Sequence, residues 1–332
     1  MRVLRPVQIS GVGCYVPEKL LTNQDLEKIV NTSNEWILKR TGIKERHIVA
    51  PGQASSDMAA EAVRTLCTSA GTDPNEIELI IVATVTPDTM FPNTACRTQH
   101  KLGIHKAWGF DLNAACCGFV YALTVGWQFV ASGTHGKVVV VGVDTMSSIT
   151  DYQDRSTCIL FGDGAGAVLL EPARDPNLCL IDFVHEIDGS GIEDLKMPAG
   201  GSLKPASHET VDQRLHFVKQ EGQAVFKFAV RKMGESSQTV LARNNFSGTD
   251  IALLIPHQAN ARIIKSAADR LGLKEEQVVL NMSKYGNTTA ATIPLAMKDA
   301  LDEGRLNKGD LVVLTSVGAG YTVGAALLRW AF

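Results

Sequence analysis

The chain has 332 residues, 45% of them apolar, and carries a formal net charge of −3. This length and composition suffice for one large core or for two cores that share an interface. The small net charge argues against a nucleic-acid coat or a strongly basic membrane-binding surface, so we expect no nucleic-acid and no membrane partner.

The N-terminal sequence and the cysteines narrow the class further. Residues 1–7 form no apolar stretch of signal-peptide length, and no segment approaches the roughly 20 uninterrupted apolar residues of a membrane span, so we expect a cytoplasmic protein. The seven cysteines are an odd number and scattered, without C-x-x-C spacing or paired histidines. This pattern disfavours a disulfide framework and a structural zinc site, and we expect no metal.

Strand and helix patterns alternate in the first half of the chain. Residues 79–85 and 137–143 are apolar runs that predict buried strands, and residues 94–102 predict a helix ending at Gly103. Cys116 and Cys117 precede a segment that is apolar nearly all round, as expected of a helix buried at the centre of a domain. The alternation indicates an α/β fold.

Two glycine-rich segments occupy the middle of the chain. Residues 162–166 lead into a strand pattern, whereas a dinucleotide-binding fingerprint requires a helix there, so we interpret them as a tight turn. Residues 189–210, rich in glycine, serine, proline and lysine, predict a loop over the active site. Because no linker separates independent domains, we expect halves 1–173 and 174–332 to pack as one unit, with the seam between Glu171 and Leu178.

The second half repeats the pattern of the first. A Leu-Gly pair closes a predicted helix at 102–103 and again at 271–272, and the next helix-closing glycines, Gly133 and Gly304, follow 30 and 32 residues later. On this register Cys116 and Asn287 both fall at the start of corresponding helices, which a pseudo-twofold arrangement would bring together. The predicted elements of this half are strands at 251–255 and 311–316 and helices at 261–271 and 290–303.

Cys116 is the candidate nucleophile. Two adjacent cysteines are most simply core residues, because cysteine is often buried. Here, however, small residues at 114–115 and Gly118 give access, and the unpaired N–H groups of a helix start stabilise a thiolate. We therefore predict a lowered pKa for Cys116 and prefer it to Cys117 as the acyl carrier.

His257 and Asn287 are the candidate partners of the thiol. His257 follows the apolar run 251–256, where a buried strand ends at the sheet edge at which α/β proteins bind ligands; the alternative is a histidine satisfied by a neighbouring carbonyl. Asn287 could be an ordinary turn residue. Together, an imidazole and a carboxamide can donate hydrogen bonds to a developing oxyanion, which predicts acyl-thioester chemistry. The Gly-Ala-Gly-Tyr segment at 318–321 is either a structural turn or a source of an oxyanion N–H.

Cationic and aromatic side chains flank these motifs. Arg262, on the helix after His257, and Lys227, on another predicted helix, belong either to solvated faces or to a docking patch. Trp36 and Arg40, four residues apart, either stack on and pair with a nucleotide or mark a helix with a half-buried tryptophan.

The combined motifs resemble those of β-ketoacyl-acyl-carrier-protein synthase III, a family of the thiolase superfamily. The resemblance runs nearly end to end, with the motifs in the family's order. They are Asp-Leu-Asn-Ala-Ala-Cys at 111–116 with Gly118 and Phe119, Pro-His-Gln-Ala-Asn at 256–260, Gly-Asn-Thr at 286–288, Thr-Ser-Asn-Glu-Trp-Ile at 32–37, Arg-Thr-Gly-Ile at 40–43, Phe-Gly-Asp-Gly-Ala-Gly at 161–166 and Gly-Ala-Gly-Tyr-Thr at 318–322.

This resemblance implies a thiolase-like α/β fold, an αβαβα five-layer sandwich built from two related halves, normally as a homodimer. It also implies a decarboxylative Claisen condensation of an acyl-CoA primer with malonyl-acyl-carrier protein (malonyl-ACP), which initiates fatty acid biosynthesis. Acyl-CoA and malonyl-ACP are then substrates, acyl carrier protein is the protein partner, and no cofactor is expected.

Residue roles follow from the same resemblance. Cys116 is implied to be the acylated nucleophile, while His257 and Asn287 hold the malonyl thioester carbonyl during decarboxylation. The backbone N–H groups of Cys116 and Ala319 are implied to form a second oxyanion hole. The remaining assignments are Thr32, Trp36, Arg40 and Arg155 to CoA, Arg262, Lys227 and Gln258 to carrier docking, and Phe91 to the acyl pocket of the partner subunit.

The chain departs from the family pattern at Cys117, where alanine is frequent, at Ala319, where glycine can stand, and at Val323, where tryptophan is often seen. These differences leave the choice of primer open. Ala319 keeps its N–H, so the oxyanion role survives if its φ is negative.

Four other functions compete with this interpretation. A degradative thiolase needs a second cysteine near the C-terminus, whereas the last one here is Cys179. A relative serving secondary metabolism, with another primer or acceptor, stays open. A Cys-His-Asn hydrolase would use His257 to activate the thiol and Asn287 to orient the histidine. A thiolase-fold scaffold predicts that no acyl-CoA acylates Cys116.

Overall fold

The computed structural model describes residues 4–332 and contains two large sheets of related topology. The first has the order β1-β7-β6-β4-β5, in which β4 runs parallel to β5 and β6, and β7 antiparallel to β1 and β6. Read in the order β8-β13-β12-β11, the second sheet has the same strand directions as the first four strands of the first sheet. An isolated parallel bridge between Leu254 and Val278 lies at the position of the fifth strand. The strands are β1 (Val7–Tyr15), β4 (Leu79–Ala83), β5 (Trp108–Leu112), β6 (Val138–Thr145), β7 (Asp163–Pro172), β8 (Leu180–Ile187), β11 (Leu253–Pro256), β12 (Leu311–Gly318) and β13 (Thr322–Arg329).

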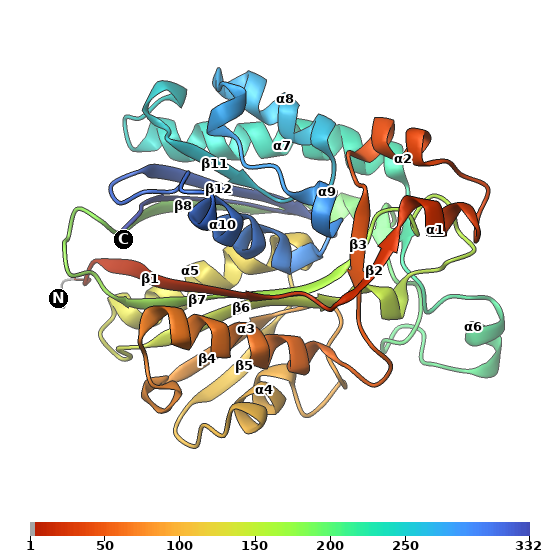
Figure 1. The fold of residues 1–332 in the computed structure, drawn as a ribbon, viewed down its shortest axis with the longest axis horizontal. Coiled ribbons are helices and arrows are strands. Elements are labelled where there is room, and N and C mark those ends of the chain that lie inside the picture. The colour runs from red at the N-terminus through yellow and green to blue at the C-terminus, as the bar shows by residue number, and fades with distance from the viewer. Residues whose placement is uncertain (1–3) are drawn as a thin grey trace.

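Helices form three layers around the two sheets, as Figure 1 shows. Two of them, α5 and α10, lie between the sheets, and their apolar side chains join both sheets in one continuous core. The pairs α3 with α4 and α7 with α8 cover the outer faces, so the predicted five-layer α/β sandwich is confirmed. The longer helices are α3 (Ser55–Ala70), α4 (Thr94–Leu102), α5 (Gly118–Ala131), α7 (Gly222–Arg243), α8 (Ala261–Leu271) and α10 (Thr292–Asp302).

Shorter elements lie at the edge of the sandwich that carries the candidate residues. The hairpin of β2 and β3 lies beside helices α1 and α2, and a long excursion between β8 and α7 carries β9, α6 and β10. The excursion is therefore less irregular than predicted. These elements are β2 (Lys19–Thr22), α1 (Asn23–Glu27), α2 (Asn34–Thr41), β3 (Glu45–Ile48), β9 (Leu195–Lys196), α6 (His208–Asp212), β10 (Lys219–Gln220) and α9 (Met282–Tyr285).

The predicted repeat is confirmed at the starts of the two central helices. A 3-10 turn, Ala115–Cys117, leads into α5, and an equivalent turn, Thr289–Ala291, leads into α10. The two turns contact each other between the sheets. Two turns from different halves of the chain are thereby gathered at one point, because an α/β sandwich of two related halves places its equivalent helices back to back at the centre.

One local prediction is wrong. Residues 162–166 do not form a tight turn, since β7 begins at Asp163 and pairs on both sides. The Gly162 N–H instead donates to the Asn287 carbonyl at 3.1 Å, and the Asn287 N–H donates to the Leu160 carbonyl at 2.9 Å. The glycine-rich segment therefore fixes the backbone of a candidate site residue, which the sequence pattern alone did not indicate.

Gly142 on β6 is required for the close approach of the two halves. A β-carbon built on Gly142 would lie 2.2 Å from the Ala290 carbonyl oxygen. Gly142→Ala is therefore expected to lower the free energy of unfolding by about 3 kcal/mol, the upper part of the overpacking range, because the obstacle is backbone. Chemical denaturation measures this, with Gly201→Ala as the control, since a β-carbon there meets nothing within 4 Å. Equal stability of the two variants would contradict the expectation.

Candidate active site

Two cavities meet at Cys116. The smaller, about 100 Å³, is lined by Cys116, His257 and Asn287 together with apolar side chains of α7. The larger, about 410 Å³, lies on the other side of Cys116 and is lined mainly by apolar side chains such as Met146 and Ile149. The structure thus brings the three predicted side chains, from three distant segments, to one cavity and gives Cys116 access to a second.

Cys116 sits in the turn that starts α5 and is only 6% exposed. The second half holds this turn: the Ser316 hydroxyl donates to the Cys116 carbonyl at 2.8 Å, and the Thr322 hydroxyl donates to the Ala114 carbonyl at 2.9 Å. Cys117 points elsewhere, since its thiol contacts the Ser316 carbonyl at 3.7 Å. The preference for Cys116 as the group facing the cavities is therefore supported by position.

The predicted lowering of the Cys116 pKa is wrong for the free protein. Burial, together with the smaller effect of the negative charge of Asp144, raises the pKa of the Cys116 thiol to about 12. The free-energy cost of desolvating a thiolate is larger than the stabilisation that the N–H groups of the helix start provide. Cys116 therefore rests as a thiol in the free protein.

His257 follows the last residue of β11, and its backbone N–H donates to the Thr315 carbonyl at 2.8 Å. The side chain is 3% exposed, and burial lowers its pKa to about 3. The imidazole is therefore neutral at physiological pH and offers one donor and one acceptor nitrogen. Nδ1 contacts the Thr292 hydroxyl at 2.7 Å.

Asn287 is oriented by its own helix start. The side-chain oxygen of Asn287 accepts a hydrogen bond from the Thr289 backbone N–H at 2.9 Å. This contact fixes which end of the carboxamide is oxygen and leaves the NH₂ group for the cavity that Asn287 lines. His257 and Asn287 can thus present N–H donors to one oxygen atom of a ligand.

Asp144 is a buried acidic residue beside the start of α10 that the sequence reasoning did not single out. It is the last residue but one of β6, is fully buried and accepts hydrogen bonds from the Val85 N–H at 2.8 Å, the Ala290 N–H at 3.1 Å and the hydroxyls of Thr84 and Thr86. Burial raises its pKa. An acidic residue closing the apolar run 138–143 is the signal that was available in the sequence.

The segment after β12 approaches the nucleophile. A β-carbon built on Gly318 would lie 2.9 Å from the Cys116 backbone nitrogen, so glycine allows the 318–319 backbone to reach this point. Ala319 lines the larger cavity beside Cys116, and its φ is not among the positive values of the described residues. Ala319 thus satisfies the requirement for a φ that is not positive, and its N–H is compatible with an oxyanion role.

Trp36 on α2 is enclosed by two arginines. The guanidinium carbons of Arg40 and Arg155 lie 4.6 Å and 4.9 Å from the centre of its indole ring. The nearby Thr32 hydroxyl is buried and has no hydrogen-bond partner within residues 4–332. The structure therefore gathers Trp36, Arg40 and Arg155 into one cationic, aromatic surface, with Thr32 four residues before the tryptophan.

The three residues assigned to carrier docking do not share one environment. Arg262 and Lys227 are exposed, and the Arg262 guanidinium stacks 4.9 Å from the ring of Phe226, which lines the smaller cavity. Gln258 is only 1% exposed, and its side chain hydrogen-bonds the backbone of Pro256, Val279 and Asn281. The assignment of Gln258 to a docking surface is therefore wrong, because its amide is buried and hydrogen-bonds the backbone inside the fold.

Phe91 is 85% exposed and lines neither of the two cavities described above. Its neighbour Met90 is 79% exposed, and Trp108, on the unpaired edge strand β5, is 48% exposed. Met90 and Phe91 precede α4 near the carboxyl end of β5, whereas Trp108 begins β5 at the opposite end. Met90 and Phe91 are therefore the exposed apolar pair that a partner could cover.

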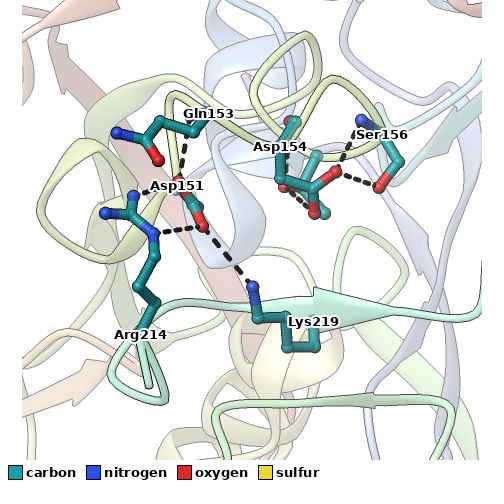
Figure 2. Close-up of polar contacts among 7 residues, drawn as sticks. Asp151, Gln153, Asp154, Ser156, Arg214 and Lys219 are labelled. Atoms are coloured by element: carbon teal, nitrogen blue, oxygen red, sulfur yellow. Dashed lines mark hydrogen bonds and ion pairs between the residues drawn. The ribbon is translucent and has the colours of Figure 1, made fainter. Parts of the chain in front are cut away.

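An ionic clamp holds the excursion between β8 and α7 over the larger cavity. Asp151, which is 4% exposed, accepts hydrogen bonds from Arg214, including one from Nε at 3.1 Å, and lies 3.5 Å from the Lys219 ammonium (Figure 2). Asp154 and Ser156 form a separate turn in the same loop, on either side of Arg155. The excursion contributes Leu195, Met197 and Val218 to the cavity wall.

Asp151→Asn is expected to loosen this excursion. Hydrogen bonding from Arg214 lowers the pKa of Asp151 to about 2, so the ionised clamp stabilises the fold above the ordinary value of 3.8 and is lost as the pH falls toward 2. The variant lacks the charge at every pH. Limited proteolysis at neutral pH should cut residues 195–220 faster than in Glu193→Gln, which breaks only an exposed ion pair of the same excursion. Equal cutting would contradict the clamp.

Residues 4–332 contain neither a metal-ligand cluster nor a membrane-spanning helix. Within this range, no group of three or more His, Cys, Asp and Glu side chains is arranged to hold a metal ion. None of its helices combines the length and apolar character that a bilayer crossing requires.

Comparison with known proteins gives a consistent result. Two family profiles, described as 3-oxoacyl-[acyl-carrier-protein] synthase III and its C-terminal part, match residues 110–189 and 241–330. A β-ketoacyl-[acyl-carrier-protein] synthase III from Solibacter usitatus is 61% identical over 98% of this chain and 99% of its own length.

Solved structures agree. The crystal structure of 3-oxoacyl-[acyl-carrier-protein] synthase III from Aquifex aeolicus has a TM-score of 0.90 and 42% identity, covering 98% of this chain and 100% of that one. A priming β-ketosynthase from a polyketide biosynthetic pathway has a TM-score of 0.91 and 33% identity, covering 100% and 98% of the two chains. Both similarities extend over the whole sandwich.

Proposed function

The chain belongs to the 3-oxoacyl-[acyl-carrier-protein] synthase III family, and we propose that it joins an acyl-CoA primer to malonyl-ACP through an acyl-Cys116 intermediate. One observation carries this proposal: Cys116 lines both cavities. The larger, apolar cavity suits a primer chain, and the smaller one, with His257 and Asn287, suits the malonyl thioester.

In the first half-reaction the Cys116 sulfur attacks the thioester carbonyl of the primer. The backbone N–H groups of Cys116 and Ala319 are the proposed donors to the oxygen that becomes negative. Collapse of the intermediate breaks the bond to CoA, and CoA leaves with the proton that the thiol gives up. The high pKa of Cys116 requires this proton to move with bond formation.

In the second half-reaction malonyl-ACP loses CO₂, and the electron pair of the broken bond forms an enolate. The N–H groups of His257 and Asn287 donate hydrogen bonds to the enolate oxygen. Two neutral donors in a buried cavity can stabilise this negative charge without a metal ion. The enolate carbon attacks the acyl-Cys116 carbonyl, and the sulfur leaves and regains a proton. Acyl-CoA and malonyl-ACP are thus substrates, and no further cofactor takes part.

The partner assignments are proposals of the same kind. Trp36, Arg40 and Arg155, with Thr32, would hold the CoA nucleotide through stacking and charge. Arg262 and Lys227, exposed near the mouth of the smaller cavity, would receive an acidic acyl carrier protein. A homodimer, in which Phe91 reaches the partner's acyl pocket, would cover the exposed side chains of Met90 and Phe91. The proposed division into halves 1–173 and 174–332 is supported by the two sheets, whose strands lie in residues 7–172 and 180–329.

The contacts of His257 argue against a Cys-His-Asn hydrolase. That chemistry needs the asparagine to orient the histidine, whereas Nδ1 of His257 contacts Thr292, and the Asn287 side-chain oxygen is bound to Thr289. The second candidate is a priming synthase of secondary metabolism, favoured by the likeness to the polyketide β-ketosynthase. It would use the same residues with a different primer or acceptor.

Intact-protein mass spectrometry after incubation with acetyl-CoA and longer acyl-CoA primers tests the proposal. We expect the mass of one acyl group on Cys116, and release of that group as a β-ketoacyl thioester once malonyl-ACP is added. A profile limited to short primers favours initiation of fatty acid biosynthesis, and one limited to unusual primers favours the secondary-metabolic alternative. A protein that no primer acylates would be a scaffold.

A further inference from the structure

The start of α10 contacts the His257 ring at Nδ1. Thr292, the first residue of α10, is 2% exposed, and its hydroxyl oxygen lies 2.7 Å from Nδ1 of His257. The same oxygen lies 2.9 Å from the Thr289 carbonyl. One hydroxyl proton therefore has two possible acceptors, and its choice decides which nitrogen of the neutral imidazole carries the ring proton.

Two observations favour donation to the imidazole. The Thr289 carbonyl already accepts a hydrogen bond from the Thr292 backbone N–H, so it is satisfied without the hydroxyl. The 2.7 Å separation is typical of an O–H donor, whereas N–H···O contacts centre at about 2.9 to 3.0 Å. With Nδ1 accepting, the ring proton stands on Nε2.

We propose that Thr292 is a positioning residue that holds His257 in the Nε2–H tautomer, so that the imidazole donates into the cavity. This inference rests on the proposed function, in which His257 must donate to the malonyl carbonyl oxygen. It makes the start of α10 responsible for both donors, because the Thr289 N–H orients the Asn287 carboxamide and the Thr292 hydroxyl orients the ring. Both contacts come from one turn and its helix.

Nitrogen-15 NMR of the histidine rings tests the tautomer directly in the wild-type protein, with His257 assigned by the loss of its signals in His257→Ala. We expect a single Nε2–H tautomer in the wild type and in Thr292→Ser, which keeps the hydroxyl. Thr292→Val has nearly the same shape and no hydroxyl, and it should show a mixture of tautomers. A wild-type ring protonated on Nδ1 would overturn the proposal, whether or not the valine variant folds.

The two half-reactions supply an independent readout. Thr292→Val is expected to lower the rate of malonyl-ACP decarboxylation by the acyl-enzyme about 10- to 100-fold, as for residues that orient a functional histidine, while acylation by acetyl-CoA stays near the wild-type rate. Thr292→Ser should restore decarboxylation. Thr98→Val is the matched control, since the buried Thr98 hydroxyl has no partner within residues 4–332.

Two outcomes separate this inference from the proposed function. Wild-type decarboxylation in the folded Thr292→Val variant would overturn the role of Thr292 while leaving the synthase function intact. A wild-type protein that decarboxylates no malonyl-ACP would contradict the proposed synthase function. The tautomer seen by NMR would still show whether Thr292 determines which ring nitrogen of His257 carries the proton.

Discussion

Cys116→Ser is expected to abolish condensation, with at least a 1,000-fold loss by the order of magnitude known for removed nucleophiles. A hydroxyl is a far weaker acid than a thiol, and the burial that raises the thiol pKa to about 12 would hinder ionisation of serine still more. The acyl adduct should disappear from the mass spectrum after incubation with acetyl-CoA. Decarboxylation of malonyl-ACP needs His257 and Asn287 and should be retained in part.

Cys117→Ala is the matched control for this variant. Cys117 is adjacent, completely buried and lines neither cavity, so its replacement leaves a small void and removes only a weak thiol contact. We expect acylation at the wild-type level and a stability loss of about 1 kcal/mol. Acylation that survives in Cys116→Ser, or that fails in Cys117→Ala, would show that the nucleophile is misassigned.

His257→Ala and Asn287→Ala are expected to separate the two half-reactions. Each removes one donor to the enolate oxygen, and loss of such a donor typically lowers the rate about 100- to 1,000-fold. Acylation of Cys116 by acetyl-CoA should persist, because the backbone N–H groups of Cys116 and Ala319 serve that step. Mass spectrometry follows the acyl-enzyme, and CO₂ release from malonyl-ACP follows decarboxylation.

The pH dependence sharpens this expectation. Burial holds the pKa of His257 near 3, so wild-type decarboxylation should show no histidine titration between about pH 5 and 8. In the unfolded chain this histidine takes up a proton below its ordinary pKa of 6.5, whereas in the folded protein it stays neutral down to about pH 3. Its contribution to the free energy of unfolding is therefore present above pH 6.5 and is lost as the pH falls toward 3. An equal loss of acylation in both alanine variants and Cys116→Ser would refute the division of labour.

Much of the fold could be predicted because local sequence signals agree with the tertiary arrangement. The helices predicted at 94–102 and 261–271 are α4 and α8, with the same ends, and the apolar runs at 137–143 and 311–316 lie in β6 and β12. Each helix has a side-chain cap at its first turn and a glycine at its end, signals that act within a few residues.

The misses share a different cause. Asp144 joins the site through the Ala290 N–H, 146 residues away, and Thr292 reaches His257 across 35 residues. Gln258 stands inside a motif of functional residues yet hydrogen-bonds only the interior backbone. No local pattern distinguishes a polar residue that faces a cavity from one that supports its wall, since both are buried and both are hydrogen-bonded.

The amino-acid order alone therefore determined the α/β class, the repeat and the identity of the thiol, imidazole and carboxamide, because periodicity, caps and residue chemistry are properties of short segments. The five-layer arrangement was implied by the family resemblance. Only the folded chain decided the protonation state of Cys116, the orientation of His257 and Asn287 and the existence of two cavities at one sulfur. These depend on desolvation and on contacts between the halves, and both arise when the two sheets close over α5 and α10.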